Sequence, residues 1–496
     1  MKKFPEKVFL AAFLLGLCGC MVGPDYVDPK ETIGEREILD FQKFANEDGL
    51  WKTATPKDTE PRGDWWLAFN DEVLNGYMAE CEKSNPDIKS IFYKVEQAAE
   101  NAQMKRSALY PQAGATADWF KTEVGDRSIL RPLGSRFEDW AVGATLTWDA
   151  DLFGRIRSVL AASRAEAQGL RDEYENALLS LRTKAASLYF SLREFEAEKN
   201  LLEKTVELRE SQLRFVADRY EMQTTSEADL QRAREQLYST KAQLTDMLER
   251  IALGKNLLAN LLGTTPAKLK ISPSPLEGNP PETPAVVPSE LLERRADIAA
   301  AERAVCAANY RIGAAQAAFF PTVSITSSLG TESTAFSKLL NSSSFAWGVS
   351  PQIYIPIFQA GRLVSQKSVA LSKHKAALED YKSAVLKAVR ETEDALAKSS
   401  LSKRRYLELE KAAKAARKVA DITQAQYESG VADYFQASEA HRYALMNELM
   451  FIKSSGERFR ASIELVRALG GSWKHREKEK NAGIEKAVEL FEGSAQ

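Results

Sequence analysis

The sequence is poor in histidine, in cysteine and in excess positive charge, and each shortage argues against a class of function. Its three histidines, His374, His441 and His475, have no cysteine or carboxylate at metal-ligand spacing. No Gly-rich phosphate loop and no nucleophile elbow is present, so the sequence predicts no enzyme, no metal site and no bound cofactor. A formal net charge of −2 over 496 residues also argues against nucleic acid as a partner.

The N-terminus has the features of an export signal. Three lysines precede the ten-residue apolar run 8–17, which is too short to span a bilayer. The following "LCGC" at 17–20 resembles a bacterial lipobox, which implies removal of 1–19 and acylation of Cys20 (N-palmitoyl and S-diacylglycerol). An ordinary signal peptide with incidental cysteines is the alternative. Position 21 is Met, not the Asp that marks retention in the inner membrane, which favours the outer membrane.

Only Cys81 and Cys306 remain beyond the signal. Two cysteines do not form a disulfide framework, and their spacing does not show whether they pair. The sequence favours two buried, small apolar side chains.

The chain contains an internal repeat. Residues 85–111 align with 295–321 at a constant offset of 210. After a three-residue difference in the next loop the offset becomes 207 and holds, so that Trp140 falls on Trp347. We therefore expect two halves with the same order of elements: helix, strand, loop, strand, very long helix, turn and shorter helix.

Proline marks the boundaries between these parts. Residues 266–288 contain seven prolines, whereas none lies between Pro132 and Pro266 or after Pro356. The expected segments are a signal peptide (1–19), a lipidated N-terminal segment (20–63), a first repeat (64–263), a Pro-rich linker (264–290), a second repeat (291–470) and a charged tail (471–496).

Each half has one very long helical stretch and one shorter return helix. Residues 155–220 and 362–427 are rich in Ala, Leu, Glu and Arg, and each would be about 100 Å long. The return stretches 226–263 and 433–470 would be about 57 Å long. Helices of this length must pack along one another. A solvated cytoplasmic coiled coil is the alternative, and the export signal argues against it.

The turns between long and short helices have capping chemistry. Ser226 and Asp433 each stand three residues ahead of an acid or amide, as in a capping box. Gly430 can take the left-handed conformation that ends the preceding helix. The first turn, "YEMQTTS", lacks such a glycine.

Four short segments alternate with period two: 113–119, 140–148, 322–329 and 344–355. One face is apolar with aromatic residues at its ends, and the other is mostly small. Trp140 to Trp148 would span about 27 Å, comparable with the apolar band of an outer-membrane barrel, with lipid on the Trp side and water on the small side. Pro351 suggests a kink or an early strand end.

Four strands cannot close a membrane barrel, because the smallest closed barrels have eight. Several chains would have to share one barrel. Loops 120–139 and 331–344 would then face the outside of the cell, and both long helices would leave the barrel toward the periplasm.

The chain resembles a known family, the TolC-like outer-membrane efflux channels of tripartite pumps, and specifically their lipoprotein branch, the NodT family. The resemblance covers nearly the whole mature chain. Its pieces are "CMVGPDYVDP" (20–29), "DWWLAFNDEVLNGYMAECEKSNPDI" (64–88), "WDADLFGRIR" (148–157), "ERRADIAAAE" (293–302), "FPTVSI" (320–325), "PIFQAGR" (356–362) and "LGGSW" (469–473).

The resemblance implies a mixed α and β membrane protein, mainly α: a homotrimer with a twelve-stranded outer-membrane β-barrel and a twelve-helix periplasmic α-barrel. An equatorial girdle would include 20–63, 264–290 and the tail. Its partners would be outer-membrane lipid, a periplasmic adaptor protein and an inner-membrane RND-type transporter. The channel would export small molecules such as antibiotics and other xenobiotics, without catalysis. The alternative is a periplasmic coiled-coil adaptor or structural lipoprotein of the envelope.

The family closes its channel at the periplasmic helix tips with acidic residues, which correspond here to Asp229 and Glu439. Glu439 departs from the usual Asp, and Asp229 can equally be a capping acid. Rings of three such acids would draw cations and could pair with Arg232, Arg234 or Arg442. The gate candidates are Asp229, Glu439, Tyr427 and Arg442; the candidates for adaptor contact at the tips are Ser226, Gly430 and Asp433; the lipid-facing girdle is Trp119, Trp140, Trp148 and Trp347.

Overall fold

The structure is a computed structural model, and it describes residues 21–29, 64–123, 125, 127, 136–269, 276, 278–281 and 294–471. The signal segment, Cys20, all of 30–63, most of 264–290 and 472–496 lie outside the described residues. Among the described residues, the chain divides into two compact units. The first comprises 21–29, 92–173 and 297–384, and the second comprises the rest.

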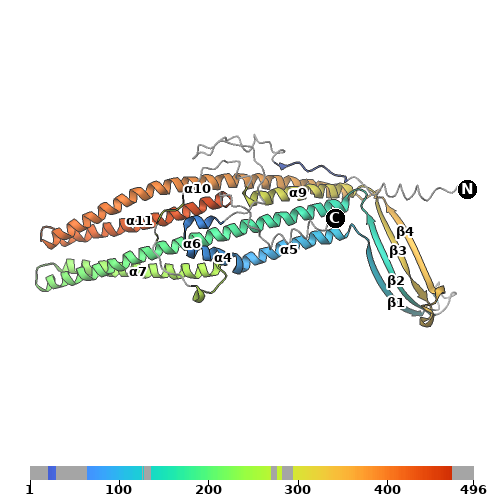
Figure 1. Cartoon of the computed structure of the whole chain (residues 1–496), viewed down its shortest axis with the longest axis horizontal. Helices are drawn as coiled ribbons and strands as arrows, with labels where there is room; N and C mark the ends of the chain where they lie inside the picture. Colours follow the sequence, from blue (N-terminus) through green and yellow to red (C-terminus); the bar gives the residue numbers. More distant parts are fainter. Residues whose placement is uncertain are drawn as a thin grey trace. The chain divides into compact units, whose positions relative to one another are not determined.

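The first unit contains one antiparallel sheet with the strand order β1-β2-β3-β4 (Figure 1). The strands are β1 (Gln112–Glu123), β2 (Arg136–Ala150), β3 (Thr322–Ser333) and β4 (Phe345–Tyr354). All four were predicted from the alternating pattern. β1, β2 and β3 extend further than predicted, so parts of 120–139 and 331–344 are strand rather than loop, whereas β4 lies within the predicted 344–355.

Pro351 does not end its strand. β4 continues to Tyr354, with Pro351 opposite Ile325 of β3, so the prediction of an early strand end is wrong. β4 lies at an edge of the sheet, and an edge strand tolerates proline because one side of its backbone needs no ladder partner.

A glycine stands at each junction between strand and long helix. Gly154 and Gly361 have φ of 75° and 83°, a left-handed conformation that glycine adopts without the clash of a Cβ atom. The helix α6 (Arg155–Glu221) follows the first glycine and α10 (Arg362–Glu428) follows the second. At the start of α6, the Asp151 carboxylate accepts backbone N–H groups from Ile156 at 3.0 Å and Arg157 at 2.8 Å. Local sequence therefore turns the chain from strand to helix at this point.

The second unit contains the two return helices and the parts of α6 and α10, 174–221 and 385–428, along which they run. α7 (Glu227–Leu261) returns along α6, and α11 (Tyr434–Ala468) returns along α10 (Figure 1). Leu202 of α6 packs with Met247 and Ile251 of α7, and Lys398 of α10 pairs with Glu464 of α11 at 2.7 Å. The predicted order of long helix, turn and return helix is confirmed.

The other described helices are short. They are α4 (Glu72–Ser84), α5 (Pro86–Ser107), α9 (Ala296–Ala317) and the 3-10 helices η1 (Trp65–Phe69), η3 (Pro266–Lys268), η4 (Phe336–Lys338) and η5 (Ser342–Ser344). No described helix combines the length and the apolar character needed to cross a membrane.

Asp71 fixes α4 to α6. One carboxylate oxygen caps α4 by accepting the backbone N–H groups of Val73 and Leu74 at 3.0 and 3.1 Å. The other accepts the Tyr189 hydroxyl at 2.8 Å and the Arg193 guanidinium at 2.6 Å. One side chain thus starts a helix and holds it in place.

Both cysteines of the described region are free. Cys81 is fully buried, as predicted, and burial raises the pKa of its thiol to about 12. Cys306 is only partly buried, so the prediction of burial holds in part for this residue.

Candidate functional site

The turns at the far ends of α6 and α10 close with the same hydrogen bonds. In the second turn, Val431 N donates to Gln426 O at 2.8 Å and Gly430 N donates to Tyr427 O at 3.1 Å. This is a Schellman motif, and Gly430 has the predicted left-handed φ, 79°. In the first turn, Thr224 and Gln223 make the equivalent bonds at 2.9 Å each. Gln223, with φ of 59°, takes the place that glycine holds in the second turn.

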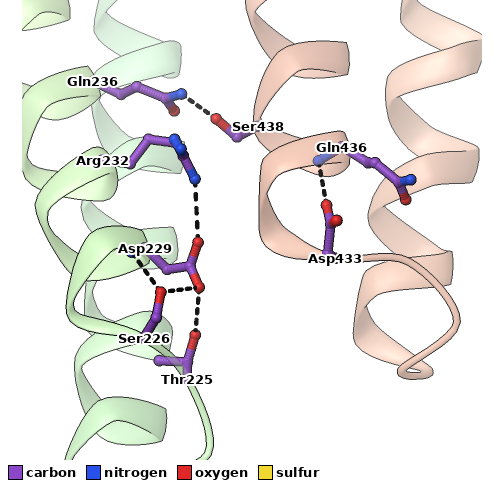
Figure 2. Close-up of polar contacts among 8 residues, drawn as sticks. All are labelled: Thr225, Ser226, Asp229, Arg232, Gln236, Asp433, Gln436 and Ser438. Atoms are coloured by element: carbon purple, nitrogen blue, oxygen red, sulfur yellow. Dashed lines mark hydrogen bonds and ion pairs between the residues drawn. The ribbon is translucent and has the colours of Figure 1, made fainter.

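Asp229 is held in the first turn of α7 (Figure 2). The Ser226 Oγ accepts the Asp229 backbone N–H at 3.2 Å, which confirms the predicted cap. The Asp229 carboxylate accepts the hydroxyls of Ser226 at 2.7 Å and Thr225 at 3.1 Å. It also pairs with Arg232 at 3.2 Å. These contacts give Asp229 a capping role, while its role in a gate remains a prediction.

The start of α11 is capped by Asp433, whose Oδ1 accepts the Gln436 N–H at 2.7 Å, as predicted (Figure 2). One turn later, Arg442 donates to both carboxylate oxygens of Glu439, at 3.0 and 2.6 Å. These hydrogen bonds lower the pKa of the Glu439 carboxyl. The guanidinium of Arg442 also lies 4.7 Å from the ring centre of Tyr443. Each acidic gate candidate therefore has an arginine partner one turn away on its own helix.

Tyr427, the third gate candidate, belongs to an apolar cluster that joins all four helices at the tips. We call Val216, Leu230, Ala233, Tyr427, Tyr434 and Ala437 the tip cluster. The rings of Tyr427 and Tyr434 lie 5.6 Å apart, edge to face, and burial raises the pKa of the Tyr427 hydroxyl. Tyr427 thus joins α10 to its neighbours as a packing residue.

A buried polar layer lies next to the tip cluster along the helices. Arg209 donates to Gln212 at 3.1 Å and to Gln236, and Gln236 donates to Ser438 (Figure 2). Gln424 lies 3.1 Å from the ring Nε2 of His441. Burial lowers the pKa of Arg209, and burial together with Arg209 lowers that of His441 to about 4.

The sequence carries one signal for this layer, a seven-residue spacing along α6. Leu202, Arg209 and Val216 repeat every seven residues along α6, and the two apolar members belong to buried clusters. A charged residue at such a position marks a specific contact between helices.

Both faces of the sheet are uncovered within the described part of the chain. On the apolar face, Leu146 of the central strand β2 is 40 % exposed and Trp347 of β4 is 72 % exposed. Trp119 and Trp140 are directly opposite, with ring centres 5.4 Å apart. At the other end of β2, the Trp148 ring N–H donates to Leu109 O at 3.0 Å. Trp119 and Trp140 thus lie toward one end of the apolar face and Trp148 toward the other. Trp347 pairs with Leu329, which lies opposite Ala144, midway between Trp140 and Trp148. Contact of these four side chains with lipid remains a prediction.

The N-terminal arm, residues 21–29, lies against the strand-to-helix junction. Val22 N donates to Phe153 O at 3.2 Å, and the Asn309 side chain donates to Pro24 O at 3.1 Å. Met21 packs on Gly154 so closely that a Cβ there would lie 2.8 Å from the Met21 Cα. The residue that follows Cys20 is thus fixed at the end of β2.

Among the described residues, no three His, Cys, Asp or Glu side chains come together as a metal site.

Comparisons with known proteins agree with these features. The sequence pattern of the outer membrane efflux protein family matches residues 78–264 and 287–471. The chain is 28 % identical over 481 residues to the cation efflux system protein CusC of Escherichia coli O6:H1, covering 95 % of this chain and 99 % of the relative. It is 29 % identical over 482 residues to the solvent efflux pump outer membrane protein SrpC of Pseudomonas putida, with 95 % and 99 % covered.

Solved structures show the same fold. The open-state structure of the Neisseria gonorrhoeae MtrE outer membrane channel matches with a TM-score of 0.77 and 25 % identity, over 91 % of this chain and 98 % of that chain. The family pattern covers both helix-strand-strand-helix halves, and the relatives align over nearly their whole length. The chain therefore belongs to the outer membrane efflux protein family.

Proposed function

We propose that this outer-membrane efflux channel works as a homotrimer, in which three four-stranded sheets form one twelve-stranded barrel. The observation that carries the proposal is the sheet itself. It exposes an apolar face bounded by tryptophans, and within the described chain β1 and β4 each have a strand neighbour on one side only. A lone sheet with these features would expose apolar surface and open edges, which a shared barrel in lipid removes.

The N-terminal arm supports the orientation of the barrel. An acylated Cys20 would place its lipid chains next to Met21, which packs on Gly154 at the end of β2. Acyl chains belong in the membrane, so this end of the barrel would lie at the periplasmic leaflet. α6 and α10 would then continue into the periplasm as a twelve-helix tunnel.

The helix tips would meet a periplasmic adaptor protein, which links the channel to an inner-membrane RND-type transporter. The turns around Ser226, Gly430 and Asp433 are the ends of the two helix pairs, and they are the proposed contact. The cargo would be small molecules, and the channel would carry out no catalysis. The names of two relatives refer to cations and to solvents, and either class would pass through a channel of this kind.

The same tips would close the channel at rest. In a trimer Asp229 and Glu439 would each form a ring of three carboxylates, with Arg232 and Arg442 as the partners already present on the same helices. Arg234 would be a further partner. Opening would separate these rings as the adaptor spreads the tips.

The test is single-channel conductance of the purified full-length protein in planar bilayers. The unmodified chain should insert as a trimer and show discrete, low conductance steps. The double variant Asp229→Ala/Glu439→Ala should raise the conductance and reduce cation selectivity, because both acidic rings are lost. The control variant is Asp246→Ala/Glu408→Ala. It also removes one carboxylate from each repeat, but away from the helix tips, and it should leave the conductance unchanged. Equal conductance of both double variants and the unmodified chain would show that the gate assignment is wrong.

A further inference from the structure

We infer that β4 of one subunit pairs with β1 of the next in a single register, with Gln352 directly opposite Asp118. Trp347–Tyr354 then lies opposite Thr116–Glu123. The inference rests on the proposed trimer and goes further, because it names the residues that meet at each seam of the barrel.

Both hairpins of the chain have the same register. Trp119 of β1 pairs with Trp140 of β2. The repeat offset is 210 for the first strand and 207 for the second, so the counterparts of Trp119 and Trp140 in the second half are Leu329 and Trp347. These two residues are directly paired between β3 and β4. The counterparts of Gln112 and Thr147, Thr322 and Tyr354, are paired as well.

The pairing between the two hairpins gives the register expected at the seam. β2 pairs antiparallel with β3, and Thr145 lies opposite Ser328. In the repeat, β4 is the counterpart of β2 and β1 is the counterpart of β3. If each seam between hairpins is built alike, the pair Thr145 and Ser328 becomes Gln352 of one subunit and Asp118 of the next.

The direction and the faces of the strands agree with this register. The strands alternate in direction, so β4 and the next β1 are antiparallel, as β2 and β3 are. Ile353 and Ala117, which the register makes neighbours, both belong to the apolar face of the sheet, while Gln352 and Asp118 belong to the small, polar face. A slip by one residue would move every side chain of one strand to the wrong face. The register therefore keeps one continuous apolar surface across the seam.

The contact joins two different edges, so it is head-to-tail and closes as a ring only at a fixed number of copies. Pairing of two β1 edges or two β4 edges would stop at a dimer. The partner that fits each edge is thus the opposite edge of a second copy of this chain.

Cysteine cross-linking in isolated outer membranes tests the register. Directly opposite residues have Cα atoms about 4.5–5.5 Å apart, which suits a disulfide, whereas diagonal neighbours are about 7–8 Å apart. The variant Asp118→Cys/Gln352→Cys should form covalent trimers on oxidation. The displaced variants Thr116→Cys/Gln352→Cys and Phe120→Cys/Gln352→Cys should yield at least tenfold less.

A control within one chain shows whether the geometry permits the bond. Thr145→Cys/Ser328→Cys occupies the equivalent ladder position inside the subunit and should give an oxidised monomer with altered gel mobility. If either displaced variant cross-linked better than Asp118→Cys/Gln352→Cys, the register would be overturned while the trimer stayed intact. A full-length chain that is monomeric in mild detergent would instead overturn the proposed function on which the register rests.

Discussion

The first turn is expected to gain stability when its left-handed residue becomes glycine. Gln223 has φ of 59° and occupies the same position in its Schellman motif as Gly430 in the other turn. An L-residue in this conformation costs roughly 1–2 kcal/mol, because its Cβ crowds the backbone. Gln223→Gly should therefore stabilise the closed turn by about 1 kcal/mol, and Gly430→Ala should destabilise the other by about the same amount.

The surroundings make this a test of backbone conformation alone. The Gln223 side chain is exposed, so its loss removes no buried contact. A Cβ added to Gly430 would meet no atom within 4 Å, so Gly430→Ala adds no clash. Gln223→Ala is the matched control, since it removes the same side chain but keeps the Cβ atom that causes the strain.

Hydrogen exchange followed by mass spectrometry measures both turns in the intact protein. The relevant amides are those of Thr224 and Val431, which close the two motifs. A change of about 1 kcal/mol alters the opening equilibrium about fivefold. Gln223→Gly should slow exchange at the first turn by about that factor, Gly430→Ala should speed it at the second, and Gln223→Ala should change little. Equal protection in Gln223→Gly and Gln223→Ala would refute the reasoning.

Three other predictions concern the helical unit and the lipid anchor. Burial beside Glu194 raises the pKa of Glu198 to about 7 from its ordinary 4.5, so the folded chain holds a proton that the unfolded chain loses, and stability falls as pH rises through this range. Glu198→Gln should thus raise the unfolding temperature at pH 8 and have no effect near pH 4.5. A larger change in unfolding temperature at pH 4.5 than at pH 8 would contradict this. Gly456→Ala places a Cβ 2.7 Å from Glu194 Cδ, so Glu194 must leave its buried ion pair with Arg460. The substitution should lower the free energy of unfolding by about 3 kcal/mol. An unchanged midpoint of denaturant unfolding would contradict this prediction. Cys20→Ser should abolish incorporation of labelled palmitate, and continued labelling would exclude Cys20 as the acylated residue.

The period and length of the sequence pattern predicted the strands and the long helices well. Strict alternation over 140–148 and the absence of proline from 155–220 leave few other solutions. The helix caps were equally visible, because Ser226 and Asp433 act on residues three positions away. Local rules of this kind do not depend on knowing which elements meet.

Contacts between distant segments were harder to foresee. Gln223 adopts the left-handed conformation that glycine usually takes. Its turn closes with the same two hydrogen bonds as the turn at Gly430. Arg209 donates to Gln236 of α7, which lies 27 positions further along the chain. Asp71 caps α4 through residues two and three positions away, but its hydrogen bond from Tyr189 joins residues more than a hundred positions apart in the chain. Such contacts require the fold to be known first.

We expect one face of the sheet to meet lipid and the other to line a water-filled pore. Thr145 and Leu146 are neighbours in β2 and point to opposite faces, so a cysteine at each position reports on one face. In isolated outer membranes, Thr145→Cys should react with a charged, membrane-impermeant thiol reagent. Leu146→Cys should resist that reagent and react with a lipid-soluble one. Equal labelling of both cysteines by the charged reagent, or labelling of Leu146→Cys alone, would contradict the account.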